Sequence, residues 1–448
     1  MAEFSADWLL VDAGWMRDAT IVHEKGIVTA IHAGRAREHL ACAILPGMAN
    51  LHSHAFQRSF AGQTEFAGGG GDFWSWREAM YRAVGTIEPD TLAPVAAYLG
   101  MQLLQGGFTS LVEFHYLQNA RDGTPYAHRP AMAEAVIEGA QQAGIGLTLL
   151  FGIYQTGDFG GLPLAGGQMR FRTAPDDALR MLQAARPLFP EVRFGLAPHS
   201  LRAVPPDSLR AALAGLTMAD AAAPLHMHAA EQPAEVAACI AALGARPVEW
   251  LLHGTDLGPR WCLIHCTHTT QAERHGLAAS GAVAGLCPST EGNLGDGIFH
   301  LPDFAGAGGR FGIGTDSHVG LDAFAELRLL EYSQRLRAGK RNVLAVTDGH
   351  TGRTLWQAAA AGGAQAAARP IGALRVGRRA DLVAIEPTPE VAGLDPDFWL
   401  DAALFTALRP PARHVMVGGN WLVRDGDHVR QHSITAAYKR ALARMSGA

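Results

Sequence analysis

Residues 43–54, AILPGMANLHSH, begin as an apolar run and end in two histidines one residue apart, His52 and His54. Seven further apolar segments each lead into a loop with polar residues and then into a helical stretch rich in alanine and leucine. They are TSLVEFHY (109–116), IGLTLLFGIY (145–154), EVRFGLAPHS (191–200), PLHMHAAE (224–231), WCLIHCTH (261–268), AVAGLCPS (282–289) and RFGIGTDS (310–317). Continuous apolar strands that alternate with helices are typical of a parallel sheet buried on both faces. Eight such units predict an α/β protein built on a (β/α)8 TIM barrel.

The two ends of the chain have a different pattern. Residues 7–36 and 375–425 contain short apolar segments separated by turn residues. Neither piece is large enough to bury a sheet alone, so we expect the two to combine into one small β-sandwich domain beside the barrel. The predicted divisions are 1–46 for its first part, 47–372 for the barrel, and 373–448 for its second part with a C-terminal helix.

Composition excludes several classes of protein. Of the 448 residues, 48% are hydrophobic and 18% are charged, which is typical of a folded enzyme, and the net charge of −5 argues against a nucleic-acid partner. The N-terminal residues lack a basic stretch ahead of an apolar one, and no apolar run reaches membrane-spanning length. Five scattered cysteines indicate reduced thiols. We therefore expect a cytoplasmic protein with no membrane partner.

Polar residues stand where the predicted strands end, and in a barrel of this kind the active site lies at the carboxyl ends of the strands. His52 and His54 share one face of a strand because side chains alternate along it. His228 ends the fifth predicted strand, His265 the sixth, and Asp316 the eighth. Imidazole and carboxylate ligands suit Zn²⁺ or Fe²⁺ and leave a position open for water. The pattern predicts a catalytic metal centre.

Each of these signals is weak alone. An isolated HxH pair is common, and a single aspartate after a strand is usually a helix N-cap. The convergence of several candidate ligands on one end of one barrel makes the metal site the stronger interpretation. A structural zinc knuckle of Cys262, His265, Cys266 and His268 is rejected, because on a strand both cysteines face away from His265. We expect the cysteines to pack in the barrel wall.

Several longer motifs resemble the amidohydrolase superfamily of metal-dependent barrels. They are PGMANLHSH (46–54), HMHAAE (226–231), WCLIHCTHTT (261–270) and GTDSH (314–318). Within that superfamily the chain is most similar, over nearly its whole length, to the formimidoylglutamate deiminases of bacterial histidine breakdown. Asn50 stands where many superfamily members have aspartate, a difference that we expect metal binding to tolerate.

The resemblance implies one divalent ion, Zn²⁺ or alternatively Fe²⁺, held by His52, His54, His228 and Asp316. It further implies that Asp316 takes a proton from the attacking water, that His265 polarises this water, and that Glu231 passes a proton to the leaving nitrogen. The alternative for Glu231 is a carboxylate favoured by a helix dipole. Many relatives hold two metals bridged by a carbamylated lysine, but Lys25, Lys340 and Lys439 all lie far from the strand ends.

The implied substrate is N-formimino-L-glutamate, which hydrolysis converts to N-formyl-L-glutamate and ammonia in histidine degradation. A dicarboxylate calls for arginine, whose planar fork matches a carboxylate. Arg77 lies in a long insertion, roughly residues 55–100, and Arg202 follows His199. The alternative for Arg77 is a surface arginine that covers Trp74 or Trp76. The predicted substrate-binding residues are Gln57, Arg77, Tyr116, His199 and Arg202.

Two other functions stay open. A deaminase of a purine or pterin ring would need an apolar slot and a group that reads ring nitrogens rather than two arginines. A non-catalytic barrel that acts as a scaffold would be favoured by loss of a ligand or of the proton carrier, and the sequence retains all of them. We expect the enzyme to be a homodimer.

Overall fold

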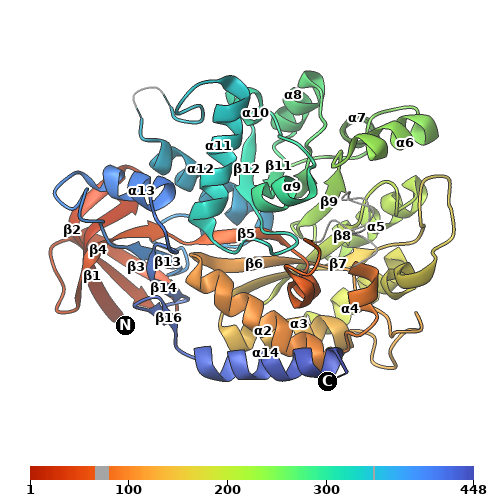
Figure 1. Ribbon diagram of the computed structural model, residues 1–448, viewed down its shortest axis with the longest axis horizontal. Coiled ribbons are helices and arrows are strands. Elements are labelled where there is room, and N and C mark those ends of the chain that lie inside the picture. Colours follow the sequence, from red (N-terminus) through yellow and green to blue (C-terminus); the bar gives the residue numbers. More distant parts are fainter. Residues whose placement is uncertain (66–79, 347–348, 448) are drawn as a thin grey trace.

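The computed structural model describes residues 1–65, 80–346 and 349–447. Within these residues the strands form two eight-stranded sheets. One sheet is the barrel at the centre of the molecule, and the other lies at one side, where strands from the N-terminal and C-terminal parts of the chain pair with each other (Figure 1). The prediction of a barrel with a small domain built from both termini is confirmed.

The barrel strands are parallel and follow one another around the sheet in chain order. They are β5 (Met48–Ser53), β6 (Phe108–His115), β7 (Gly146–Ile153), β8 (Arg193–Pro198), β9 (Leu225–Ala229), β10 (Trp261–His265), β11 (Val283–Leu286) and β12 (Arg310–Ile313). The last strand returns to the first through a bridge between Ser53 and Asp316 and a 3.0 Å hydrogen bond from Asp316 N to His52 O. Closure therefore brings the ends of β5 and β12 into contact.

Helices cover the outside of the barrel and connect its strands (Figure 1). They are α2 (Pro89–Gln105), α3 (Ala131–Ala143), α4 (Pro175–Ala185), α5 (Pro206–Ala219), α6 (Pro233–Leu243), α7 (Pro247–Gly254), α8 (Gln271–Ser280), α9 (Pro288–Leu294), α10 (Leu301–Gly306), α11 (Ala323–Ala338) and α12 (Thr351–Ala367). Two short 3₁₀ helices, η1 (Ala55–Phe60) and η2 (Gly166–Phe171), lie in the loops at the carboxyl ends of the strands. Among the described residues, no single helix is long and apolar enough to cross a membrane; only the pair α6 and α7, bent by 46°, passes by length and composition.

The segment 43–54, which the sequence suggested was one strand, is divided between the two sheets. Its first part belongs to β4 (His39–Pro46) of the small domain, and its second part is β5 of the barrel. The division falls at Gly47, whose N–H donates a 2.9 Å hydrogen bond to Asp381 O. A Cβ atom at Gly47 would lie 2.8 Å from that same oxygen and would also meet Thr109 Oγ1. Only glycine fits where the chain passes between the two sheets.

We expect Gly47→Ala to destabilise the protein by about 1–3 kcal/mol, the usual consequence of forcing extra volume into a packed site. A lowered thermal midpoint in calorimetry would show it. The matched control is Gly306→Ala, because Gly306 lies in α10 with nothing within 4 Å of its Cβ position. A Gly47→Ala protein as stable as that control would contradict the expectation.

The small domain is one continuous sheet in the order β16-β15-β14-β13-β4-β1-β2-β3. Its strands are β1 (Ala2–Val11), β2 (Gly14–Glu24), β3 (Ile27–Ala33), β4, β13 (Leu382–Ile385), β14 (Ala412–Val417), β15 (Asn420–Arg424) and β16 (Asp427–His428). A β-bridge joins Ile27, the first residue of β3, to Arg379, just before β13. The edge strand β3 therefore lies next to the segment that precedes β13, so the sheet is strongly curved. Phe4, Ile21 and Leu382 belong to the separate apolar core enclosed in this way.

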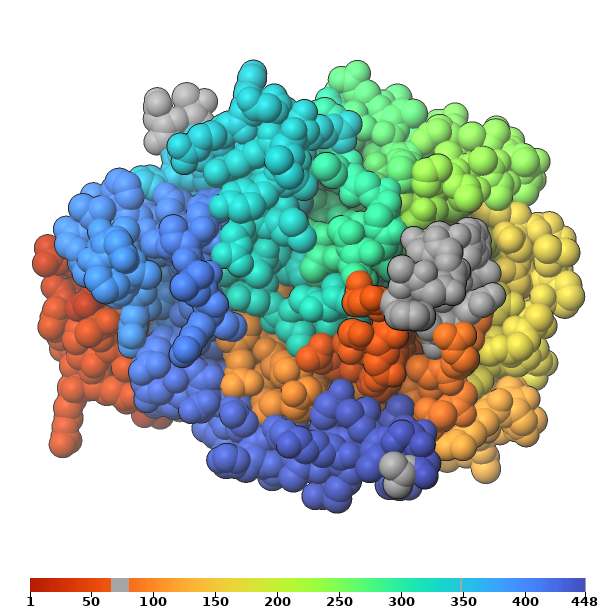
Figure 2. All heavy atoms as spheres, in the orientation of Figure 1, coloured from red at the N-terminus to blue at the C-terminus, as the bar shows by residue number. Residues whose placement is uncertain are grey.

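Two helices after residue 373 pack against the barrel. Helix α13 (Pro396–Phe405), which the sequence did not suggest, contacts α11 and α12. Helix α14 (Gln431–Met445), the expected C-terminal helix, lies along α2, where Tyr438 and Tyr98 stack with ring centroids 4.0 Å apart. Figure 2 shows α14 along the lower edge, away from the small domain at the left.

Candidate metal centre and active site

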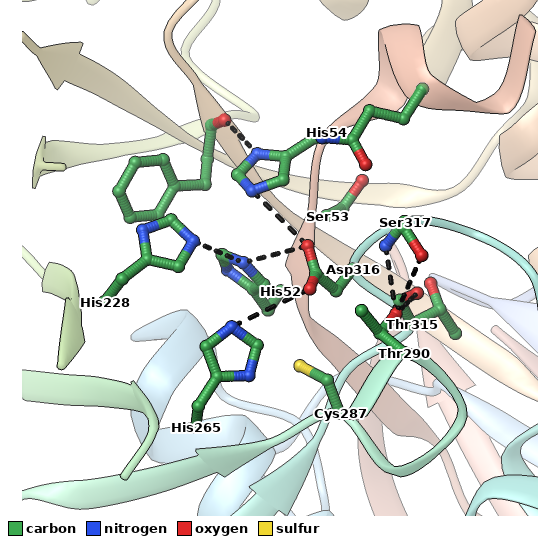
Figure 3. Close-up of polar contacts among 12 residues, drawn as sticks. His52, Ser53, His54, His228, His265, Cys287, Thr290, Thr315, Asp316 and Ser317 are labelled. Atoms are coloured by element: carbon green, nitrogen blue, oxygen red, sulfur yellow. Dashed lines mark hydrogen bonds and ion pairs between the residues drawn. The ribbon is translucent and has the colours of Figure 1, made fainter. Parts of the chain in front are cut away.

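Three imidazoles and one carboxylate converge inside the mouth of the barrel (Figure 3). Asp316 Oδ1 lies 3.4 Å from His52 Nε2 and 3.4 Å from His54 Nε2. His228 Nε2 lies 3.1 Å from His52 Nε2. All four residues are buried. The structure therefore brings together the four residues that the sequence suggested as metal ligands.

The histidines are held in the form that a metal requires. His54 Nδ1 lies 2.9 Å from Phe114 O, and His228 Nδ1 lies 2.9 Å from His199 O. Each Nδ1–H donates to a backbone carbonyl, so each Nε2 keeps its lone pair, as in the outer shells of known metal sites. Burial lowers the pKa of His52, His54 and His228 below the ordinary histidine value, so the rings are neutral.

The donor set fits a divalent cation. His52 Nε2 has the Nε2 of His228 and the Oδ1 of Asp316 within 3.4 Å, and one proton on His52 can serve only one of these acceptors. A cation at the centre satisfies every lone pair at once. Nitrogen and oxygen donors in this number suit Zn²⁺ or Fe²⁺.

His265 and Glu231 lie beside this cluster. His265 Nε2 is 3.7 Å from Asp316 Oδ2 and 3.8 Å from Glu231 Oε1, while its Nδ1 is 3.3 Å from Glu291 Oε1. Burial would lower the pKa of His265, but the carboxylates of Glu231, Glu291 and Asp316 outweigh it and raise that pKa to about 10. Burial raises the pKa of Glu231 above the ordinary glutamate value. This pair can hold and exchange a proton beside the ligand cluster.

The backbone is strained at the strand ends that hold these residues. Ala230, His265 and Asp316 have φ values of 53°, 68° and 43°, in the left-handed region that residues with a Cβ seldom adopt. Such strain persists only where the surroundings enforce it, and it gathers at functional sites. The three strained residues lie directly after β9, at the end of β10 and in the turn after β12, beside the ligand cluster.

Asn50 joins two ligand-bearing strands. Its Nδ2 donates a 2.7 Å hydrogen bond to Thr315 Oγ1, and its Oδ1 accepts a 3.0 Å bond from Thr315 N. The side chain thus ties β5, which ends near His52 and His54, to the turn that holds Asp316. An asparagine makes both bonds because its amide donates as well as accepts.

One cavity opens above the cluster. Its walls include all the described residues that the sequence suggested for substrate binding, which are Gln57, Tyr116, His199 and Arg202. It also includes residues that were not predicted, which are Met80, Tyr81, Tyr154, Phe171 and Leu294. Arg77 lies outside the described residues.

Arg202 is the cationic group of the cavity wall. Its Nη1 donates to Tyr154 Oη and to Gly157 O, both at 3.3 Å. Across the described ranges, no carboxylate lies within 4.0 Å of this guanidinium, whereas Arg193, Arg246 and Arg274 each pair with a carboxylate at 2.6–2.7 Å. An anionic group in the cavity would give Arg202 the charged partner that it lacks.

A barrel whose strand ends carry a metal-binding cluster under a polar cavity defines a metal-dependent hydrolase. The sequence matches the amidohydrolase family over residues 43–422, so the chain belongs to that family, whose members hydrolyse C–N bonds. It is 44% identical to the formimidoylglutamate deiminase of Pseudomonas aeruginosa over 99% of this chain and 100% of that protein. It is 29% identical to the 8-oxoguanine deaminase of the same species over 86% of this chain and 82% of that one. A crystal structure of an amidohydrolase from Brucella melitensis, 41% identical, covers all of both chains with a TM-score of 0.94.

Proposed function

We propose that this protein hydrolyses N-formimino-L-glutamate to N-formyl-L-glutamate and ammonia. The observation that supports it most is Arg202, a cation without a carboxylate partner among the described residues, in the wall of the cavity above the metal-ligand cluster. The identity of 44% over 99% of the chain to a formimidoylglutamate deiminase supports the same substrate. We also propose that the protein is a cytoplasmic homodimer that acts in histidine degradation, which rests on the family resemblance.

His52, His54, His228 and Asp316 are proposed to hold one Zn²⁺, with Fe²⁺ as the alternative. Such an ion, when bound, lowers the pKa of water and polarises the carbon–nitrogen bond to be attacked. The neutral rings provide three nitrogen donors without adding charge, and the Asp316 carboxylate offsets part of the charge of the ion.

The remaining residues move protons. Asp316 is proposed to accept a proton from the attacking water, which His265 orients with its Nε2. Glu231 then supplies a proton to the leaving nitrogen, because that nitrogen leaves as ammonia and not as an amide anion. The raised pKa of Glu231 suits this role, since the carboxyl group is more often protonated near neutral pH than an ordinary glutamate.

Substrate carboxylates are proposed to bind Arg202 and Arg77. The hydroxyl group of Tyr154 accepts a 3.3 Å hydrogen bond from Arg202 Nη1 and so helps to position the guanidinium. Gln57 Nε2 donates to Tyr116 Oη at 3.3 Å, and its buried Oε1 has no hydrogen-bond partner in the described part of the chain. That oxygen is free to accept from the N–H groups of the formimino group. The assignment of Arg77 rests on the sequence resemblance alone.

A ring deaminase is the second candidate. The aromatic walls formed by Tyr81, Tyr116, Tyr154 and Phe171 would suit a flat ring, and the relative named 8-oxoguanine deaminase is 29% identical. A neutral purine, however, would leave the Arg202 guanidinium without an anion. The dicarboxylate is therefore favoured.

We expect about one equivalent of divalent metal to remain with each chain after gel filtration. Chelation should abolish ammonia release from formiminoglutamate, and Zn²⁺ should restore it, because Asp316 Oδ1 and His228 Nε2 both lie within 3.4 Å of His52 Nε2. Elemental analysis together with the ammonia assay checks both statements. Two equivalents retained without added metal, or full activity after complete chelation, would contradict the proposed centre.

A further inference from the structure

The thiol of Cys287 faces the ligand cluster from the end of β11. Its sulfur, one carboxylate oxygen of Asp316 and one ring nitrogen of His265 all lie within 4.8 Å of one another. Figure 3 shows the sulfur directed toward the space between the His265 ring and Asp316. Cys287 is fully buried, so this thiol faces the cluster and not solvent.

Asp316 presents its two oxygens to different neighbours. Oδ1 lies 3.4 Å from the ring nitrogens of His52 and His54, whereas Oδ2 lies 3.7 Å from His265 Nε2. A carboxylate can bind a separate cation with each oxygen. The side of Asp316 that faces His265 and Cys287 is therefore distinct from the side that faces the catalytic ligands.

His265 supplies an independent sign of a ligand on that side. Its Nε2 is completely buried and has no hydrogen-bond partner among the described residues, while its Nδ1 is held by Glu291. A buried nitrogen without a partner is costly unless something binds it. A ring nitrogen of His265 also lies within 4.8 Å of donor atoms of His52 and His228, so His265 stands between the two groups of donors.

We propose that His265, Cys287 and Asp316 form a second, inhibitory site for a thiophilic divalent cation such as Zn²⁺ or Cd²⁺. Nitrogen, sulfur and oxygen donors at this spacing suit such ions, and thiolate sulfur excludes Mg²⁺ and Ca²⁺. Binding forms a metal–sulfur bond and breaks the S–H bond, and the proton passes to solvent. No electron is transferred.

The second site should fill only when the ion is in excess. It has three protein donors and shares Asp316 with the first ion, so two cations repel each other across one carboxylate. An ion there would occupy His265 and Asp316, which the proposed reaction needs free. The loss of turnover thus rests on the proposed function, whereas the binding of the ion does not.

The test is a Cd²⁺ titration of the enzyme that holds one equivalent of Zn²⁺. After gel filtration we expect one Cd²⁺ in addition to one Zn²⁺, an ultraviolet charge-transfer band from cadmium bound to thiolate, and a parallel loss of activity. At full occupancy the loss should be about 10²-fold, the size typical of losing a general acid–base group. Cys287→Ser should keep one Zn²⁺ and its basal activity, and lose the Cd²⁺, the band and the inhibition.

Cys262→Ser is the matched control, because Cys262 is a buried thiol of the neighbouring strand β10 and should leave the second ion in place. The partly buried group of Asp7, Asp18 and His39 is a competing position for a cation, although Arg35 already pairs with both aspartates. If His39→Gln removed the second ion and Cys287→Ser kept it, the proposal would be overturned. X-ray absorption of the wild-type complex needs no variant, and a spectrum without cadmium–sulfur scattering would equally overturn it.

Discussion

Glu231→Gln should keep the metal and lose turnover by about 10²-fold or more, as is usual when a general acid–base group is removed. The amide retains the shape of the side chain but cannot pass a proton to the leaving nitrogen. Glu231 lies 3.8 Å from His265 and lines the cavity, yet it does not belong to the inner group of donors around Asp316 Oδ1. Metal analysis and kcat measured on the same preparation test the two halves of this expectation.

Two variants serve as controls. His228→Ala should lose both metal and turnover, because His228 Nε2 points into the ligand cluster. Glu235→Gln should have a much smaller effect, since this carboxylate accepts hydrogen bonds from Ala230 N and Glu231 N and stays outside the cluster. If Glu231→Gln released the metal, or if it remained almost fully active, the role proposed for Glu231 would be wrong.

Arg202→Met should reduce kcat/KM for formiminoglutamate by roughly 30-fold to several thousand-fold with metal content unchanged. Loss of one partner of a buried charged hydrogen bond costs about 2–5 kcal/mol, and each 1.4 kcal/mol is a factor of ten. Methionine keeps much of the volume of arginine and removes the charge that the substrate carboxylate would meet. The same reduction is expected for Arg77→Met on the sequence resemblance.

Arg202→Lys is the informative control, because lysine keeps the charge and loses the planar fork. It should recover only part of the activity. Tyr154→Phe should have a moderate effect. It removes the hydroxyl group that accepts a hydrogen bond from Arg202 Nη1, and it leaves the aromatic ring in the cavity wall. An Arg202→Met enzyme with wild-type kcat/KM would show that the substrate carboxylates bind elsewhere.

The sequence predicted the barrel because each strand is a continuous apolar run followed by a helical stretch. It did not predict the break at Gly47, because both halves of 43–54 are apolar and hydrophobicity does not show which sheet a segment joins. Helix α13 was missed for a related reason, since residues 375–425 were interpreted through their strand-like turns alone. The sequence predicted strands and helices correctly where the hydrophobic pattern was long and repeated.

The ligand cluster was predictable because the fold places strand ends together and the ligands stand at strand ends. Tyr154 could have been found by the same rule, since it directly follows β7. Phe171 and Leu294 could not, because they come from η2 and α9 and only the folded loops bring them to the cavity. Glu291 could not be predicted either, because its contact with His265 joins α9 to β10 and forms only in the folded barrel.

Ammonia release from four compounds tests the central claim most directly. With the wild-type enzyme, formiminoglutamate should be hydrolysed best, and formimino-aspartate less well, because its second carboxylate is one methylene nearer. Formiminoglycine lacks that carboxylate and should be hydrolysed far more slowly, and guanine should release no ammonia. An enzyme that hydrolysed formiminoglycine or guanine as well as formiminoglutamate would contradict the binding of two carboxylates and would favour the ring deaminase.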